Sequence, residues 1–204
     1  MTVKERRARE KEELRAEILD AARELFAKEG YENVSMRKIA EKIDYSPTTI
    51  YLYFKDKDEL CRSVCDETTA KLVKQFDVIV ATVSDPIDQL RRAGQAYVEF
   101  GLSHPNHYKV TFMGYGLTGP VDQEKLHSQA SMGARCFMHL RTIVEKCVQQ
   151  RKIRAVDVDT TSQALWATVH GITSLLITYP DFPWVGKERL IEQVIDVMIE
   201  GLKA

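Results

Sequence analysis

Between residues 35 and 57 the chain carries hydroxyls, phenols and cations whose spacing suits a nucleic acid. Lysine and arginine can meet phosphate oxygens, which supplies affinity, while short side chains at the start of a helix can reach base edges. The residues that fit these two roles are Ser35, Arg37, Pro47, Thr48, Thr49, Tyr51, Tyr53 and Lys57. We take this set as the candidate DNA-binding site.

Two short helices must position these side chains. The first opens at Ser35, a good helix cap, and repeats apolar residues at helical spacing: Met36, Ile39, Ala40 and Ile43. Ser46-Pro47 restarts a helix, with proline at its first position, and Ile50 and Phe54 form an inward pair. The pattern predicts a helix-turn-helix with residues 46–54 as recognition helix; an ordinary helical hairpin is the structural alternative.

The order of residues from Leu14 to Leu60 resembles the DNA-binding domain of the TetR family of bacterial transcriptional regulators. The matching runs are ILDAARELFAKEGYENVSMRKIAEKI, YSPTTIYLYF and KDKDEL. Asp44 departs from the pattern, because the family usually has glycine in that turn, but aspartate tolerates a left-handed backbone better than most residues. The resemblance implies a homodimer that binds a partly palindromic double-stranded operator and responds to a small molecule.

Catalytic and metal-binding chemistry have little support. The five histidines form no HExxH pattern, and there is neither a GxSxG nucleophile nor a phosphate-cradling glycine loop. His104 and His107 stand three apart across a proline and are read as loop residues. We expect no catalytic residue, no metal and no cofactor.

Composition indicates a globular protein outside the membrane. The 204 residues are 44% hydrophobic and 29% charged, and no apolar run reaches the length that spans a bilayer. The charged start is unlike a signal peptide, so we expect a cytoplasmic protein. Cys61, Cys65, Cys136 and Cys147 lack CxxC spacing and are interpreted as buried or unreactive thiols, with sensing by the first two as a minor alternative.

Net charge is the main objection to a DNA partner. The chain carries a formal charge of −1, although residues 35–57 hold five cations against three acids. Local fields matter more than the total for steering a charged partner. Residues 2–13 mix both signs with no apolar face, so we expect them to fray or to be disordered. Arg6, Arg7 and Arg9 could instead form an arm along DNA, or the segment could be a solvated helix extension.

The remaining chain is expected to be helical throughout, giving an all-α fold of about nine helices. An apolar stripe that begins at Leu14 predicts a first helix, which ends at Gly30 with a left-handed cap. Asp56 and Glu59 are expected to form a capping box for a helix that runs to about residue 83. Further helices are expected at 86–104, 107–113, 122–151, 159–179 and 187–202. Glycines 114, 116 and 119 mark a loop. We divide the chain into an N-terminal DNA-binding domain, 1–57, and a C-terminal effector-binding and dimerisation domain, 58–204.

Two sets of residues in the second domain invite a functional reading. Eight residues on four segments, most of them aromatic and with His170 as a polar group, would wall an apolar pocket if their faces converge, or else fill a core: Tyr97, Phe100, Tyr108, Phe112, Met132, Phe137, Trp166 and His170. The Trp166-x-x-x-His170-Gly171 pattern is similar to one in the ligand domains of a TetR subgroup, whereas its structural alternative is a core tryptophan beside a close helix contact at Gly171. The resemblance also implies a dimer interface on the last two helices, at Leu165, Thr168, Ile172, Leu175, Leu176, Ile191, Val194, Ile195 and Met198.

These patterns together favour a transcriptional repressor that a small apolar effector releases from its operator. A DNA-binding architectural protein without an effector is the alternative. A helical enzyme or chaperone-like binder is a third possibility, and it would lack the helix-turn-helix geometry.

Overall fold

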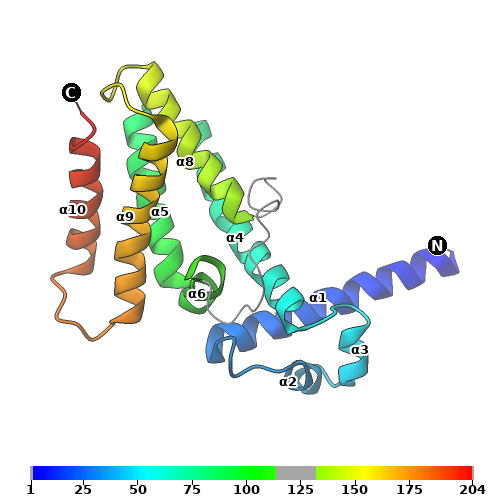
Figure 1. Ribbon diagram of the computed structural model, residues 1–204. Coiled ribbons are helices and arrows are strands. Elements are labelled where there is room, and N and C mark those ends of the chain that lie inside the picture. The colour runs from blue at the N-terminus through cyan, green and yellow to red at the C-terminus, as the bar shows by residue number, and fades with distance from the viewer. Residues whose placement is uncertain (1, 114–131, 204) are drawn as a thin grey trace. The chain divides into compact units, whose positions relative to one another are not determined.

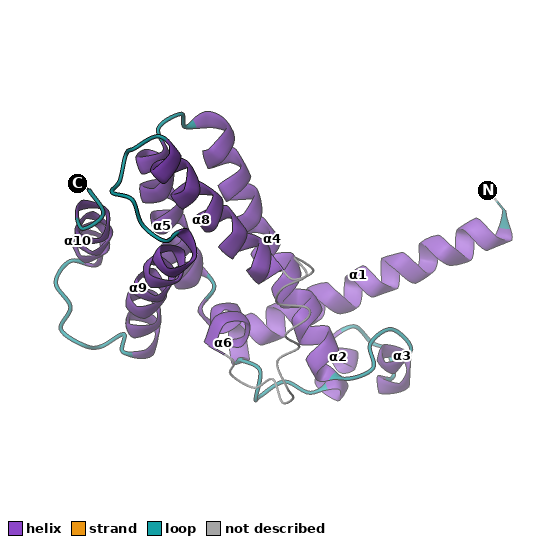
Figure 2. Ribbon diagram, turned by 45° about the horizontal axis from the view of Figure 1, so that its top comes forward, coloured by secondary structure: helices purple, strands orange, loops and turns teal. Residues whose placement is uncertain are grey.

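The computed structural model describes residues 2–113 and 132–203, and these residues contain helices and no strand (Figure 1, Figure 2). This confirms the all-α fold class. The helices are α1 (Val3–Glu29), α2 (Met36–Lys42), α3 (Pro47–Tyr51), α4 (Lys57–Thr82), α5 (Pro86–Ser103), α6 (Pro105–Met113), α8 (Met132–Gln149), α9 (Val158–Thr178) and α10 (Lys187–Glu200). The expected glycine loop and the expected start of a helix at residue 122 lie outside the described residues.

The chain forms two compact units, which we call the head and the body. The head contains the chain up to Thr68 together with residues 106–113, and the body contains Thr69–Pro105 together with residues 132–203. The long helix α4 contributes its first turns to the head and the rest to the body. The two units differ from the domains expected above, because packing places the start of α4 and most of α6 in the head. The boundary at residue 57 is a functional one and stays a prediction.

One apolar core holds the head together. Its buried residues come from all the head's helices: Ile18, Ala22 and Phe26 on α1, Met36, Ile39 and Ala40 on α2, Ile50 on α3, Leu60, Cys61, Val64 and Cys65 on α4, and Val110 on α6, with Phe54 in the turn after α3. Truncating a fully buried aromatic residue such as Phe54 typically costs about 3–5 kcal/mol. The inward pair Ile50 and Phe54 therefore anchors the short helix α3 on the head.

Local hydrogen bonds set the boundaries of the two short helices. The Ser35 and Ser46 hydroxyls accept from the backbone N–H of Lys38 and of Thr49, at 3.2 Å in each case. Asp44 takes the left-handed conformation at φ 57°, and the next backbone N–H bonds back to the Ala40 carbonyl at 3.0 Å. This is the turn for which the sequence uses aspartate in place of glycine.

Four sequence-based expectations need correction. Residues 3–13 are helical rather than frayed or disordered, in agreement with the helix-extension alternative, and Thr2 and Glu5 form a reciprocal capping box at the start of α1. Gly30 has positive φ, but its ψ of 165° lies outside the left-handed helical region. α3 ends at Tyr51, and the following residues form turns. Glu59 accepts from the backbone N–H of Lys55, so the box expected with Asp56 is only half present.

The body is a bundle in which α5, α8, α9 and α10 pack on one another. Asp85 and Asp157 cap α5 and α9 through their carboxylates, which accept backbone N–H groups at 2.8 Å. Buried apolar side chains fill the bundle, among them Leu90, Val98, Ile143, Val144, Leu176, Ile195 and Ile199. Within residues 2–113 and 132–203, no helix has both the length and the apolar content needed to cross a membrane.

Candidate DNA-binding surface and effector site

The outer face of α3 presents polar and aromatic side chains to solvent. Pro47 and Thr48 are exposed, and Tyr51 has 53% of its surface accessible. Thr49 is half-buried, with its hydroxyl 2.9 Å from that of Ser46. Tyr53 packs partly against the head core, which leaves it less available than its neighbours. A short helix whose inner face is packed on the head core and whose outer face is polar is suited to enter a groove of DNA.

Most of the cations around α3 already have partners. Arg37 pairs with Glu41 on the same helix, at 2.8 Å, and is exposed. Lys38 and Lys42 reach back to acids of α1, Glu29 and Glu24 respectively. Intrahelical and exposed pairs of this kind are weak, so Arg37 can exchange its partner for a phosphate at little cost.

Lys57 lies in a different environment from the one expected of a phosphate contact. Its ammonium stands 3.9 Å from the centre of the Tyr31 ring and donates to the Tyr31 carbonyl at 3.1 Å. The Tyr31 hydroxyl in turn donates to Asp58. Lys57 thus fastens the start of α4 to the end of α1, and only its remaining N–H donors are available to DNA.

In the body, four of the eight expected ligand residues come together on α5, α8 and α9. The Trp166 indole N–H donates to the Tyr97 hydroxyl at 3.2 Å, and that hydroxyl lies 3.3 Å from Nδ1 of His170. The Phe137 and Trp166 rings meet edge to face with their centroids 6.0 Å apart. This cluster, which we call the Trp–His cluster, combines aromatic surface with a short polar chain.

The polar chain favours one tautomer of His170. Because the Tyr97 hydroxyl accepts from the indole, its own hydrogen is well placed to go to Nδ1. The proton of a neutral imidazole is then on Nε2, which lies 3.3 Å from the Ser174 hydroxyl. Burial lowers the pKa of His170 below its ordinary value, which also favours the neutral ring at pH 7.

The other four expected ligand residues lie elsewhere. Phe100 is buried and stacks on His104, at 5.0 Å between centroids. Tyr108 and Phe112 belong to the head, where their rings are 5.1 Å apart and Tyr108 is fully buried. Met132, the first residue of α8, accepts a hydrogen bond at sulfur from Arg135.

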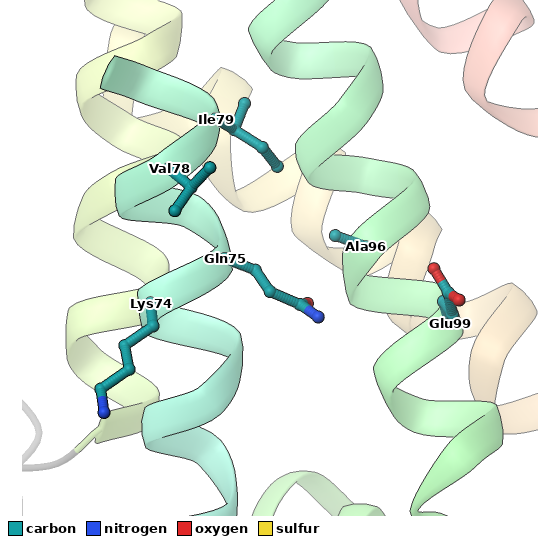
Figure 3. Close-up of a pocket in the computed structure, with 6 residues that line it drawn as sticks. All are labelled: Lys74, Gln75, Val78, Ile79, Ala96 and Glu99. Carbon is teal, nitrogen blue, oxygen red and sulfur yellow. The ribbon is translucent and has the colours of Figure 1, made fainter. Parts of the chain in front are cut away.

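An open cleft that the sequence analysis missed lies between α4 and α5 in the body and has a volume of about 390 Å³ (Figure 3). It is lined by Lys74, Gln75, Val78 and Ile79 of α4 and by Ala96 and Glu99 of α5, and it is mostly apolar. The one available signal was Val78, an apolar residue outside the inward face of α4, which is 59% exposed. None of the expected ligand residues lines this cleft.

The residues expected at a dimer interface divide by exposure. Leu165, Ile172, Leu176 and Ile195 are buried in the body and serve its core, whereas Thr168 and Leu175 are exposed and Ile191, Val194 and Met198 are half-buried. Around the exposed pair α9 carries small residues, including Gly171, at which an added Cβ would meet no atom within 4 Å. Gly171 therefore makes no close helix contact among the described residues, contrary to the structural alternative raised above.

The curated relatives of this chain are bacterial regulators that it matches in part. It is 39% identical over 67 residues to the HTH-type transcriptional regulator SAB2452 of Staphylococcus aureus, covering 33% of this chain and 36% of that protein. It is 29% identical over 126 residues to the HTH-type transcriptional activator FasR of Mycolicibacterium smegmatis, covering 61% of this chain and 58% of that protein. The chain thus spans less than two thirds of either relative.

The fold is shared with solved regulators over nearly the whole chain. The transcriptional regulator FadR from Bacillus subtilis, solved in complex with stearoyl-CoA, aligns with a TM-score of 0.76 and 20% identity, covering 92% of this chain and 98% of that one. Two family models also match: bacterial regulatory proteins of the tetR family at residues 18–64, and the tetracyclin repressor-like C-terminal domain at residues 90–201. The second match spans more than half of the sequence, and the chain belongs to the tetR family of bacterial regulatory proteins.

Proposed function

We propose that this protein is a transcriptional repressor that binds a DNA operator as a homodimer and leaves it when a small apolar effector binds the body. The observation that carries the proposal is the geometry of α3, where Ile50 is fully buried while Thr48 and Tyr51 face solvent. Its family consists of DNA-binding regulators, which supports this role over catalysis. A regulator acts where the chromosome lies, so we place it in the cytoplasm.

Two heads are needed to read a partly palindromic operator, at recognition-helix spacing of about 34–36 Å. The surface that we assign to the second subunit is the exposed face of α9 and α10. On α9 it comprises Ala164, Ala167, Thr168, Gly171 and Leu175, which share one helical face, and on α10 it includes Val197, 61% exposed. Small residues permit close approach of two helices, and the exposed leucine and valine supply apolar area.

The composition of the Trp–His cluster supports an effector that is apolar except for an uncharged or weakly polar group, which would contact the cluster. Tyr97, Trp166 and His170 form a short chain of one indole N–H, one hydroxyl and one neutral imidazole, bonded to one another, beside the Phe137 ring. Few polar groups among aromatic walls are usual in small-molecule sites. Because FadR was solved with stearoyl-CoA, a long acyl chain is the first apolar group to test, supplied as an acyl-CoA whose charged CoA part is not assigned to the Trp–His cluster. A coupling of about 1–3 kcal/mol between effector and DNA is enough to change operator occupancy.

Operator selection tests the proposal. The full chain is incubated with a library of random DNA duplexes, and the enriched duplex is titrated with the wild-type protein, with Thr48→Ala and with Tyr51→Phe. Thr48→Ala should weaken binding by about 1 kcal/mol and relax preference at one position, and Tyr51→Phe should weaken all duplexes alike. Thr142→Ala, an exposed threonine on α8, is the matched control.

Two outcomes would remove the proposal: a selection that enriches no duplex, or α3 variants that bind as tightly as the control. Acyl-CoAs of increasing chain length are then added to the complex. Release of the duplex supports an effector that opposes DNA binding, as proposed, tighter binding contradicts it, and no response to any chain length favours the architectural alternative.

A further inference from the structure

The first turns of α1 extend beyond the head core as an exposed helix. Residues 4–13 are exposed, and the apolar packing of α1 begins only at Leu14. Figures 1 and 2 both show this segment projecting past α3. Such a long extension buries no apolar surface in the head, so core stability does not account for it.

Its charges are separated by face. At about 100° per residue, Lys4, Arg7, Lys11 and Arg15 fall within a sector about 80° wide, which we call the basic face. The acids lie on the other sides of the helix, where Glu10 and Glu13 pair with Arg6 and Arg9. In the part of the chain that the structure describes, no ion pair involves a residue of the basic face.

The basic face is turned toward the side of the head that carries α3. Its sector continues along α1 as Ile18 and Ala22, both fully buried in the head core with α2 and α3. Where the basic face meets the head, the Arg15 guanidinium lies 5.1 Å from the centre of the ring of Phe54, which is in the turn after α3. The helix therefore points Lys4, Arg7 and Lys11 along the same side as the recognition helix.

Local interactions keep the segment helical, which fixes the direction of these side chains. Thr2 and Glu5 form the capping box, with the Thr2 backbone N–H donating to the Glu5 carboxylate at 2.7 Å. The ion pair between Arg9 and Glu13, at 2.6 Å, links successive turns. A disordered arm would spread its cations over all directions, whereas this helix concentrates them on one.

We infer that the basic face of α1 is a second DNA-binding site, which contacts backbone phosphates of the duplex flanking the one that α3 enters. The inference rests on the proposed DNA-binding function and deepens it. From Lys4 to Arg15 the helix rises about 16 Å, which corresponds to about 5 base pairs at about 3.4 Å each. The contacts are ionic, so they add affinity for any sequence and none of the specificity.

Salt dependence separates this site from a merely solvated helix. Each phosphate contact adds about 0.9 to the slope of log affinity against log salt concentration. The variant Arg7→Gln/Lys11→Gln removes two contacts per subunit, so a dimer should lose about 3–4 units of slope if all are made. The matched control is Arg6→Gln/Arg9→Gln, which removes the same charge from the opposite face. Glutamine has nearly the helix propensity of lysine and arginine, and the exposed i,i+4 ion pairs that the control removes are weak, so both variants should melt like the wild-type protein.

The titrations use the full chain and the selected duplex, once at full length and once trimmed by about 5 base pairs at each end. We expect the basic-face variant to lose at least about 2 units more slope than the control, and the difference to vanish on the trimmed duplex. If the wild-type protein binds the duplex specifically, then equal slopes for the two variants, or a difference in slope that persists after trimming, overturn the inference. Absence of specific binding by the wild-type protein refutes the proposed function instead.

Discussion

The Tyr97 hydroxyl joins the two halves of the Trp–His cluster, so Tyr97→Phe tests the hydrogen-bond network directly. The substitution keeps the ring and removes one oxygen, which accepts from the Trp166 indole and contacts His170. Packing is preserved because phenylalanine fills the same buried site, in which Tyr97 is 5% exposed. Any loss of stability then reports on the polar contacts alone.

The size of the loss follows from the exposure of the partners. A hydrogen bond typically contributes about 0.5–1.5 kcal/mol, and an orphaned buried partner costs more. Here Trp166 is 39% exposed and His170 is half-buried, so water can replace part of what the hydroxyl provided. We therefore expect a total loss of about 1–2 kcal/mol, which corresponds to about 2–8 °C in Tm for a chain of this size.

A double-mutant cycle isolates the bond between hydroxyl and indole. Tyr97→Phe, Trp166→Phe and the double variant are unfolded at one fixed protein concentration, because dimerisation makes Tm depend on concentration. The coupling free energy should be about 0.5–1.5 kcal/mol. Tyr179→Phe, at an exposed tyrosine, is the control and should not change Tm. Additivity within about 0.3 kcal/mol would refute the proposed link between Tyr97 and Trp166.

Two further predictions concern the body. Leu175→Glu places a charge on the exposed face of α9 and should give a folded monomer by light scattering. Leu176→Glu, at a residue that is 2% exposed, should instead unfold the chain. A folded dimer with Leu175→Glu would exclude this surface as the interface. The lowered pKa of His170 means that the unfolded chain takes up a proton first as pH falls. Stability relative to His170→Gln should therefore be constant above the ordinary pKa of histidine and decrease as pH falls toward the lower folded value, and parallel stability curves for the two proteins would contradict this.

The helix-turn-helix could be predicted from sequence because its signals are local. A capping serine, a proline at the first helical position and the pair Ile50 and Phe54 all act within a few residues of one another. Each determines a backbone boundary or an inward face without reference to the rest of the chain. Asp44 shows the same point, since its φ of 57° follows from the short turn between two helices.

Side-chain partners in the candidate sites could not be predicted in the same way, because they depend on tertiary packing. Periodicity shows that Leu175 and Leu176 lie on an amphipathic helix, but only the arrangement of neighbouring helices decides that the first is exposed and the second is buried. Residue type and helical spacing alone predict that Tyr108 shares one pocket with Tyr97. The chain instead returns Tyr108 to the head, a contact between distant segments that no local pattern encodes.

The near-neutral charge of the chain is compatible with a DNA partner once the cations are sorted by their neighbours. A count over residues 35–57 overstates the positive field at α3, because Lys38 and Lys42 are paired with acids of α1 and Lys57 is held against Tyr31. The basic face of α1 shows the opposite case, in which a segment of mixed composition separates its charges by helical geometry. Since the field at a duplex depends on which charges face it, the orientation of α1 and α3 decides the interaction, and the total of −1 has little influence on it.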